Sequence, residues 1–220
     1  MIFKRASIVH AVIAAWQALR KNPLFFLTAS VAGVLISFIG IGVNQQLVSM
    51  MSANSFSLRG LQVFSGVLGF LLESLIDYQV LYYSIRIYKG ENPSWKSFFT
   101  VPSSNFLFVL LARLRFFIIM MLGLIFFIVP GILYICSNYF AGYSILHSLT
   151  DSLKKDALMS STITKHNRWR ILLLGLITVI VSLPFSFFGF GTFITPFLLL
   201  IDLDVYNQLM EPYEETVTVL

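Results

Sequence analysis

Long runs of apolar residues, separated by short polar segments, dominate the pattern along this chain of 220 residues. A helix needs about 17–25 mostly apolar residues to cross a bilayer, and six runs have about that length. The pattern therefore predicts an all-α fold with six transmembrane helices. We place them at Leu24–Val43, Leu61–Ile85, Phe106–Val129, Ile132–Leu149, Ile171–Phe188 and Thr192–Leu209.

Short breaks predict how these helices are joined. Pro130-Gly131 forms a helix break, and Gly189–Gly191 forms another, with only a few residues available for each connection. Such short turns favour antiparallel neighbours, so we expect three hairpins. The last helix carries Pro196, Asp202 and Asp204, which leaves a re-entrant or partly interfacial segment as the alternative there.

The first 23 residues have a different pattern. Their apolar residues recur at helical intervals between polar ones, which predicts an amphipathic helix in the membrane interface. A secretory leader would need a continuous apolar run, so we do not expect one. The whole chain is then one membrane domain, with residues 1–23 interfacial, 24–210 forming the bundle and 211–220 forming an acidic cytoplasmic tail.

Composition supports a lipid solvent. Apolar residues make up 57% of the chain, charged residues only 11%, and the mean hydropathy is +0.84. Soluble domains carry about 25% charged residues, so this chain could not cover a water-facing surface. The net charge of +5 is spread over short segments, which argues against nucleic-acid binding. The single cysteine, Cys136, excludes an internal disulfide framework.

The basic residues predict the orientation. Twelve of the fifteen lie in segments that six spans would put on the side of the N-terminus. Basic segments stay in the cytoplasm, so both termini are expected there. Five of these residues should contact anionic headgroups of the cytoplasmic leaflet: Lys154, Lys155, Lys165, Arg168 and Arg170.

Four charged residues lie inside the second and third predicted spans: Glu73, Asp77, Arg113 and Arg115. Glu73 and Asp77 are four apart and share one helix face. Asp77 lies 17 residues after Gly60 and Arg113 lies 17 residues before Pro130, so both reach the same layer, roughly 25 Å from the outer ends. We expect one arginine to pair with one of the acids and the other to reach headgroups or point into the bundle. Alternatively, the arginines mark a helix boundary, or the cluster lines a substrate or ion path.

No pattern in the chain predicts catalysis. The three histidines, His10, His147 and His166, lie near expected interfaces, and His147 could meet Asp151 one helical turn away. There is no glycine-flanked serine, no HExxH and no phosphate-binding glycine loop. We therefore expect no catalytic residues, no metal site and no cofactor.

Four stretches stand out in the C-terminal half: "RFFIIMMLGLIFFIVPGILYI", "AGYSIL", "DSLKKDALMSSTITKHNRWRILLL" and "TPFLLLIDLDVYNQL". Together they resemble a broad group of bacterial polytopic inner-membrane proteins, related to the membrane domain of some glycerophosphodiester phosphodiesterases. The shared elements are Pro130-Gly131-Ile132, Ala157-Leu158 with Ser160 or Ser161, Arg168-Trp169, and Pro196 with Tyr206; His166-Asn167 stands where the group usually has a glycine. The resemblance implies a six-span protein of the bacterial inner membrane and brings no catalytic residues with it.

Two functions fit these observations. The first is a non-enzymatic, membrane-embedded module for interaction or for envelope and lipid homeostasis, with the bilayer, protein partners or a second copy as its contacts. The alternative is a small permease or channel for lipids or small solutes that uses Glu73, Asp77, Arg113 and Arg115. Paired charges in a solid core would favour the module, and a cavity open to the cytoplasm would favour transport.

Overall fold

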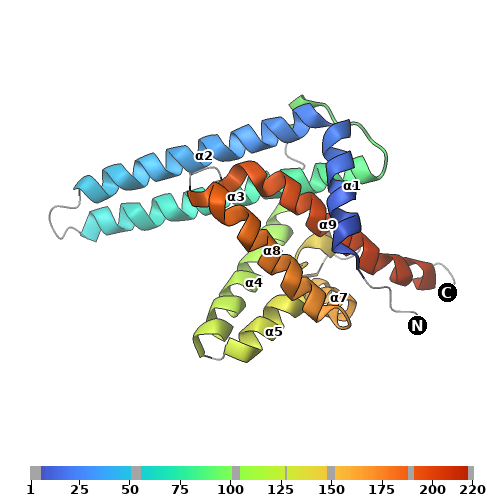
Figure 1. Cartoon of the computed structure of the whole chain (residues 1–220). Helices are drawn as coiled ribbons and strands as arrows, with labels where there is room; N and C mark the ends of the chain where they lie inside the picture. The colour runs from blue at the N-terminus through green and yellow to red at the C-terminus, as the bar shows by residue number, and fades with distance from the viewer. Residues whose placement is uncertain are drawn as a thin grey trace.

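A computed structural model of the chain describes residues 6–50, 56–100, 105–126, 128–147, 152–187 and 191–217. Every regular element in these ranges is helical, which confirms the predicted all-α fold (Figure 1). The α-helices are α1 (Ile8–Lys21), α2 (Pro23–Met50), α3 (Phe56–Tyr88), α4 (Phe106–Phe126), α5 (Ile128–Asn138), α6 (Tyr143–Leu146), α7 (Leu153–Thr164), α8 (Arg168–Phe187) and α9 (Gly191–Val217). A short 3-10 helix, η1 (Trp95–Phe99), follows α3.

Among the described residues, five segments are long and apolar enough to cross a membrane: Phe64–Tyr88, Phe106–Gly123, Ile128–Leu146, Arg168–Phe187 and Gly191–Glu211. The number rises to six if the bent pair formed by α1 and the first part of α2 is counted as one span. α2 packs against α3, α4 against α5, and α8 against α9. The α2–α3 pair and the α4–α5 pair project in different directions from the region where α1, α7 and the second half of α9 gather (Figure 1).

α1 meets α2 at an angle of 99°. The side-chain oxygen of Ser7 accepts a hydrogen bond from the backbone N–H of His10 and caps the start of α1. The chain turns at Asn22, and Pro23 occupies the first position of α2, where its missing N–H costs no helical hydrogen bond. α1 buries a narrow row of alanines, Ala11, Ala15 and Ala18, and packs against α9.

α9 is the central helix of the molecule. It packs against α1, α2, α3, α7 and α8, and every residue from Leu200 to Tyr206 is buried. The helix runs without interruption past the predicted end at Leu209 and into the predicted tail. Asp202 and Asp204 therefore face protein, which explains how an apolar helix accommodates two carboxylates.

The predicted break at Pro130-Gly131 lies elsewhere in the structure. α4 ends at Phe126 and α5 begins at Ile128, so Pro130 and Gly131 both lie in the first turn of α5 rather than between two helices. Proline is tolerated there because the first N–H groups of a helix have no helical acceptor. Gly131 is buried and lets α5 approach α4 closely.

The fourth predicted span is also not one continuous helix. α5 stops at Asn138, residues 139–142 form turns, and the single turn of α6 follows. Gly142 adopts φ +89°, a left-handed conformation that glycine accepts without a steric penalty. The segment Ile128–Leu146 as a whole is still apolar enough for a span, so its hydropathy hides this break.

Candidate functional site

Arg113 of α4 and Asp77 of α3 form an ion pair. The Arg113 Nη1 atom donates to the Asp77 Oδ2 atom at 2.9 Å. The side chains are 22% and 31% exposed, so protein covers most of each charged group but not all of it. A charge in an apolar setting is costly unless it is paired, and this pair joins two helices that meet through few other contacts.

Glu73 takes no part in that pair. It lines a cavity of about 120 Å³ with Asp77 and with Thr192 and Thr195 at the start of α9. Typical small-molecule sites have volumes of roughly 300–1,000 Å³. The space beside the carboxylates would therefore hold a few water molecules rather than an organic solute.

Arg115 points away from both acids. Its Nη1 atom donates to the backbone carbonyl of Leu153 at 3.1 Å, at the start of α7. The two arginines are two residues apart on one helix and so diverge around its axis. One ties α4 to α3, and the other ties α4 to α7.

A second carboxylate is hydrogen-bonded in the interior. The Tyr139 hydroxyl lies 3.2 Å from the Asp202 Oδ1 atom and 3.3 Å from its Oδ2 atom, and it donates to this carboxylate of α9. Asp202 is 8% exposed. Sequence analysis named Asp202 but could not bring it together with Tyr139, because 63 positions separate them and neither belongs to a recognisable motif.

Asp156 of α7 holds the break between α5 and α6. Its carboxylate accepts a hydrogen bond from the backbone N–H of Gly142 at 2.9 Å and another from the Ser144 hydroxyl. Burial raises the pKa of Asp156, and the hydrogen bonds from Ser144, Gly142 and Ile145 oppose that rise. The buried carboxylate thus supplies the acceptor that the first N–H groups of α6 lack.

Two more side chains on the same face of α7 cap the other end of the break. The hydroxyls of Ser160 and Thr164 both donate to the backbone carbonyl of Ser137, each at 3.1 Å. Asp156, Ser160 and Thr164 are spaced by four residues and are all buried. Sequence reasoning missed this row. Three polar residues spaced by four share one face of a helix, and that pattern could have revealed the row.

A polar pocket of about 320 Å³ lies at the end of α9, lined by residues that include His147, Asp204 and Gln208. Gln208 Nε2 donates to the Asp204 Oδ2 atom at 2.6 Å, and His10 Nδ1 lies 3.2 Å from the same oxygen. Burial lowers the pKa of His147 to about 4, and the nearby charge of Lys89 adds to this effect. His147 is therefore neutral at physiological pH. Residue 151, which sequence reasoning placed beside it, lies outside the described residues.

The five residues expected to contact headgroups have two different surroundings. Lys154, Lys155, Lys165 and Arg168 are exposed on α7 and at the start of α8. Arg170 is half-buried and donates to the backbone carbonyl of Ala6, which anchors the segment before α1. Trp169, between the two arginines, is 81% exposed.

Within the described ranges, no three His, Cys, Asp or Glu side chains come together as a metal-binding group. No protein-family model, curated protein or solved structure matches this chain. The buried charged and polar groups described above pair with one another or satisfy backbone groups at the ends of broken helices.

Proposed function

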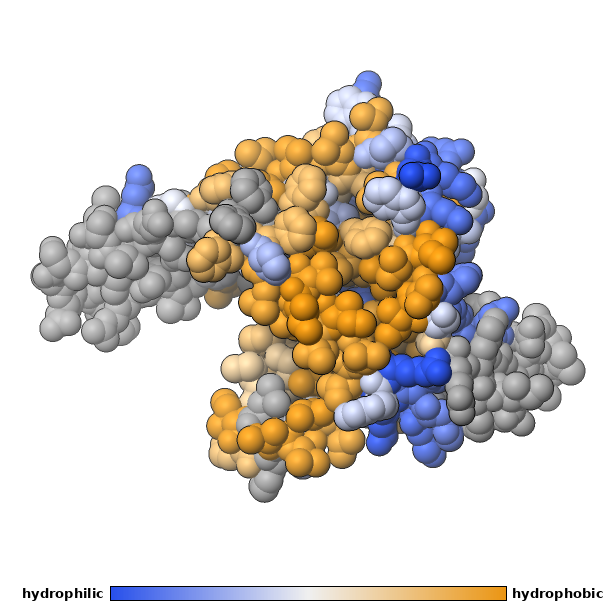
Figure 2. All heavy atoms as spheres, viewed as in Figure 1, coloured by the Kyte–Doolittle hydropathy of each residue, from blue (hydrophilic) through white to orange (hydrophobic). Residues whose placement is uncertain are grey.

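We propose that this chain is a multi-pass protein of the bacterial inner membrane, with six spans in three hairpins and both termini in the cytoplasm. The exposed surfaces of α4 and α8 support a lipid solvent, because only 11% of the residues in an apolar stretch of 18 residues in each helix are buried. Soluble proteins rarely expose whole faces of apolar helices. Figure 2 shows this apolar surface across the middle of the molecule, with hydrophilic residues gathered along one side, over α7 and near α1.

Cysteine labelling tests this topology. In a Cys136→Ala background, single cysteines replace Lys96 and Lys155 on the proposed cytoplasmic side and Arg59 on the opposite side. A membrane-impermeant maleimide should label the cysteine at position 59 in intact spheroplasts, and those at 96 and 155 only after permeabilisation. Labelling at position 155 in intact spheroplasts would reverse the proposed orientation.

Within that membrane the chain acts as a non-enzymatic interaction or lipid-homeostasis module. The ion pair between Arg113 and Asp77 carries this proposal, because two of the four charges that could line a path are engaged with each other. A third, Arg115, donates to the backbone carbonyl of Leu153. The small cavity beside Glu73 supports the same conclusion. Deep charges that pair across helices fix the packing of those helices, whereas a path needs its charges to face a passage.

Transport by a permease or channel is the alternative, and proteoliposomes separate the two functions. We expect the permeability to protons and to small polar solutes to equal that of protein-free vesicles, both for the chain and for its Asp77→Asn variant. A flux that Asp77→Asn or Glu73→Gln abolishes would establish a pathway instead.

Cross-linking in cell membranes tests the interaction directly. A photoreactive residue is introduced at Ile118 of α4 or at Ile180 of α8, both of which are exposed. The buried Leu174 provides the control position. A module should give a discrete protein adduct from an exposed position and none from position 174. Lipid adducts alone from both exposed positions would remove the protein-interaction role.

A further inference from the structure

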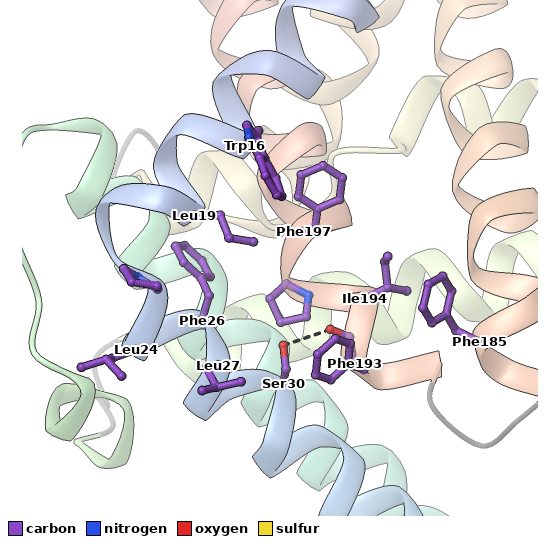
Figure 3. A pocket seen from close by; sticks show the side chains of 12 residues that line it. Trp16, Leu19, Leu24, Phe26, Leu27, Ser30, Phe185, Phe193, Ile194 and Phe197 are labelled. Atoms are coloured by element: carbon purple, nitrogen blue, oxygen red, sulfur yellow. Dashed lines mark hydrogen bonds between the residues drawn. The ribbon is translucent and has the colours of Figure 1, made fainter.

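An apolar groove lies in the elbow between α1 and α2. Its volume is about 540 Å³, and residues of α1, α2, α8 and α9 line it. Figure 3 shows Trp16 and Phe197 on one side, Phe26 and Leu27 on another, and Phe185 closing the far end. The groove has the size of a typical ligand site, roughly 300–1,000 Å³.

The lining of the groove suits hydrocarbon. Apart from the indole of Trp16, Ser30 is the one lining side chain with a polar group among the described residues. The Ser30 hydroxyl donates to the backbone carbonyl of Phe193 at 2.9 Å, so it is already engaged (Figure 3). An occupant therefore gains from burying apolar surface and not from hydrogen bonds inside the groove.

One cation stands beside the groove at the last turn of α1, and a second follows it in the chain. The Arg20 guanidinium lies over the ring of Trp16, 5.2 Å from its centroid, and Lys21 follows in the chain. Both side chains are exposed, and neither contacts a carboxylate within the described residues. The groove thus joins an apolar interior to a positively charged edge.

The bend between α1 and α2 determines how deep α1 and the groove would lie in a bilayer. If α2 crosses the bilayer, the 99° angle lays α1 along the interface. Val9, Val12 and Ile13 are exposed and would then face the acyl chains. Arg20 and Lys21 would lie among the lipid headgroups, and the groove would lie next to the acyl chains below them.

We propose that this groove binds one acyl chain of an anionic phospholipid from the cytoplasmic leaflet, with the phosphate of that lipid held by Arg20 and Lys21. The inference rests on the proposed membrane placement and names the lipid class that the module would recognise. The phosphate supplies the anionic partner that neither cation has among the described residues, and the acyl chain covers the apolar lining. A zwitterionic lipid offers the same chain but cancels part of the charge attraction.

Fluorescence quenching of Trp16 tests the proposal. Trp95→Phe and Trp169→Phe leave Trp16 as the one tryptophan of the chain. The protein is reconstituted into phosphatidylcholine vesicles that contain a minor fraction of brominated phosphatidylglycerol or, separately, brominated phosphatidylcholine. We expect the anionic quencher to be preferred by roughly fivefold or more, which is the effect of about one basic residue at a membrane surface.

Two variants distinguish a lipid bound in the groove from anionic lipid that is attracted to the basic residues alone. Arg20→Gln with Lys21→Gln should remove the preference and leave quenching by either lipid equal. Leu27→Phe narrows the groove without changing the charge, so it should also lower the preference. If Leu27→Phe leaves the preference intact, the cations attract lipid without the groove, and the proposal is overturned.

Failure of the lipid site is distinguishable from failure of the membrane placement. Equal quenching of Trp16 by both lipids would overturn the lipid site and leave the membrane placement standing. Absence of quenching by either lipid would overturn the lipid site too. Extraction of the protein from the vesicles by alkaline carbonate, measured separately, would count against the membrane placement itself.

Discussion

Gly123 of α4 faces Gly131 of α5 so closely that a Cβ atom added to Gly123 would lie 2.9 Å from the Gly131 Cα atom. Side-chain atoms essentially never come this near a backbone carbon, so the two helices must separate to accept one. Gly123→Ala should therefore lower the free energy of unfolding by about 1–3 kcal/mol, although alanine favours a helix by about 1 kcal/mol. Unfolding in detergent, followed by circular dichroism, measures the change.

Gly69 of α3 provides the matched control for this prediction. A Cβ atom there meets nothing within 4 Å, so Gly69→Ala should be neutral or stabilising by up to about 1 kcal/mol. Equal effects at positions 69 and 123 would show that helix propensity, and not the close approach, sets the result.

Asp156→Ala should open the break between α5 and α6. The substitution leaves the Gly142 N–H and the Ser144 hydroxyl without their buried acceptor, which should cost about 2–4 kcal/mol. The rate of hydrogen exchange at the backbone amides of residues 142–145 should rise by much more than the rate in the rest of the chain. Lys155→Ala, at the exposed neighbouring position, should change neither measurement. Unchanged protection at residues 142–145 in Asp156→Ala would remove the capping role.

The starts of three of the six predicted helices follow from the sequence, because polar or turn-forming residues precede the apolar runs there. The predicted starts at Leu24, Phe106 and Thr192 lie within one residue of the observed starts of α2, α4 and α9. The break after Asn138 is different. It depends on hydrogen bonds from α7, which are not local in the chain, and the apolar residues around it read as a continuous span.

Some contacts of the candidate site could also be predicted from the sequence, and others could not. Equal depth in two neighbouring helices predicted a pairing between an arginine and an acid, and the structure brings Arg113 to Asp77. Depth alone could not choose between Asp77 and Glu73, because that depends on how α3 is rotated. The bond between Tyr139 and Asp202 depends on how α9 inserts among the other helices, which no local pattern records.

A double-mutant cycle measures the pair of Asp77 and Arg113. Asp77→Ala and Arg113→Ala each leave one charge without its partner, whereas the double variant removes both charges. The double variant should therefore be more stable than the two single losses predict, with a coupling energy of about 1–3 kcal/mol. Detergent-solubilised protein, unfolded thermally, gives the required differences.

Arg86 and Glu91 form the reference pair for that cycle. Their ion pair measures 2.5 Å, but the side chains are 42% and 46% exposed. Pairs this exposed contribute about 0–1 kcal/mol. If the coupling of Asp77 and Arg113 is no larger than that of the reference pair, the charges in α3 and α4 do not stabilise the helix packing.

His147 should make the stability of the protein depend on pH. Its pKa is about 4 in the folded chain against an ordinary value of 6.5, because burial and Lys89 disfavour the imidazolium ion. Between these two values the unfolded chain binds more protons than the folded chain, so the free energy of unfolding falls as the pH is lowered from 6.5 to 4. Protonation of His147 in the unfolded state would lower the free energy of unfolding by at most about 3 kcal/mol. Well above pH 6.5, His147 is neutral in both states and its contribution to the free energy of unfolding no longer changes with pH.

His147→Phe tests this dependence, because phenylalanine keeps a ring beside Tyr206, whose centroid lies 5.2 Å from that of the imidazole. The variant should lose most of the fall in stability between pH 6.5 and 4, measured as unfolding midpoints in detergent across that range. The exposed His166 provides the control, since His166→Gln should leave the fall in place. A variant profile that still drops by the wild-type amount would assign the pH dependence to the buried carboxylates instead.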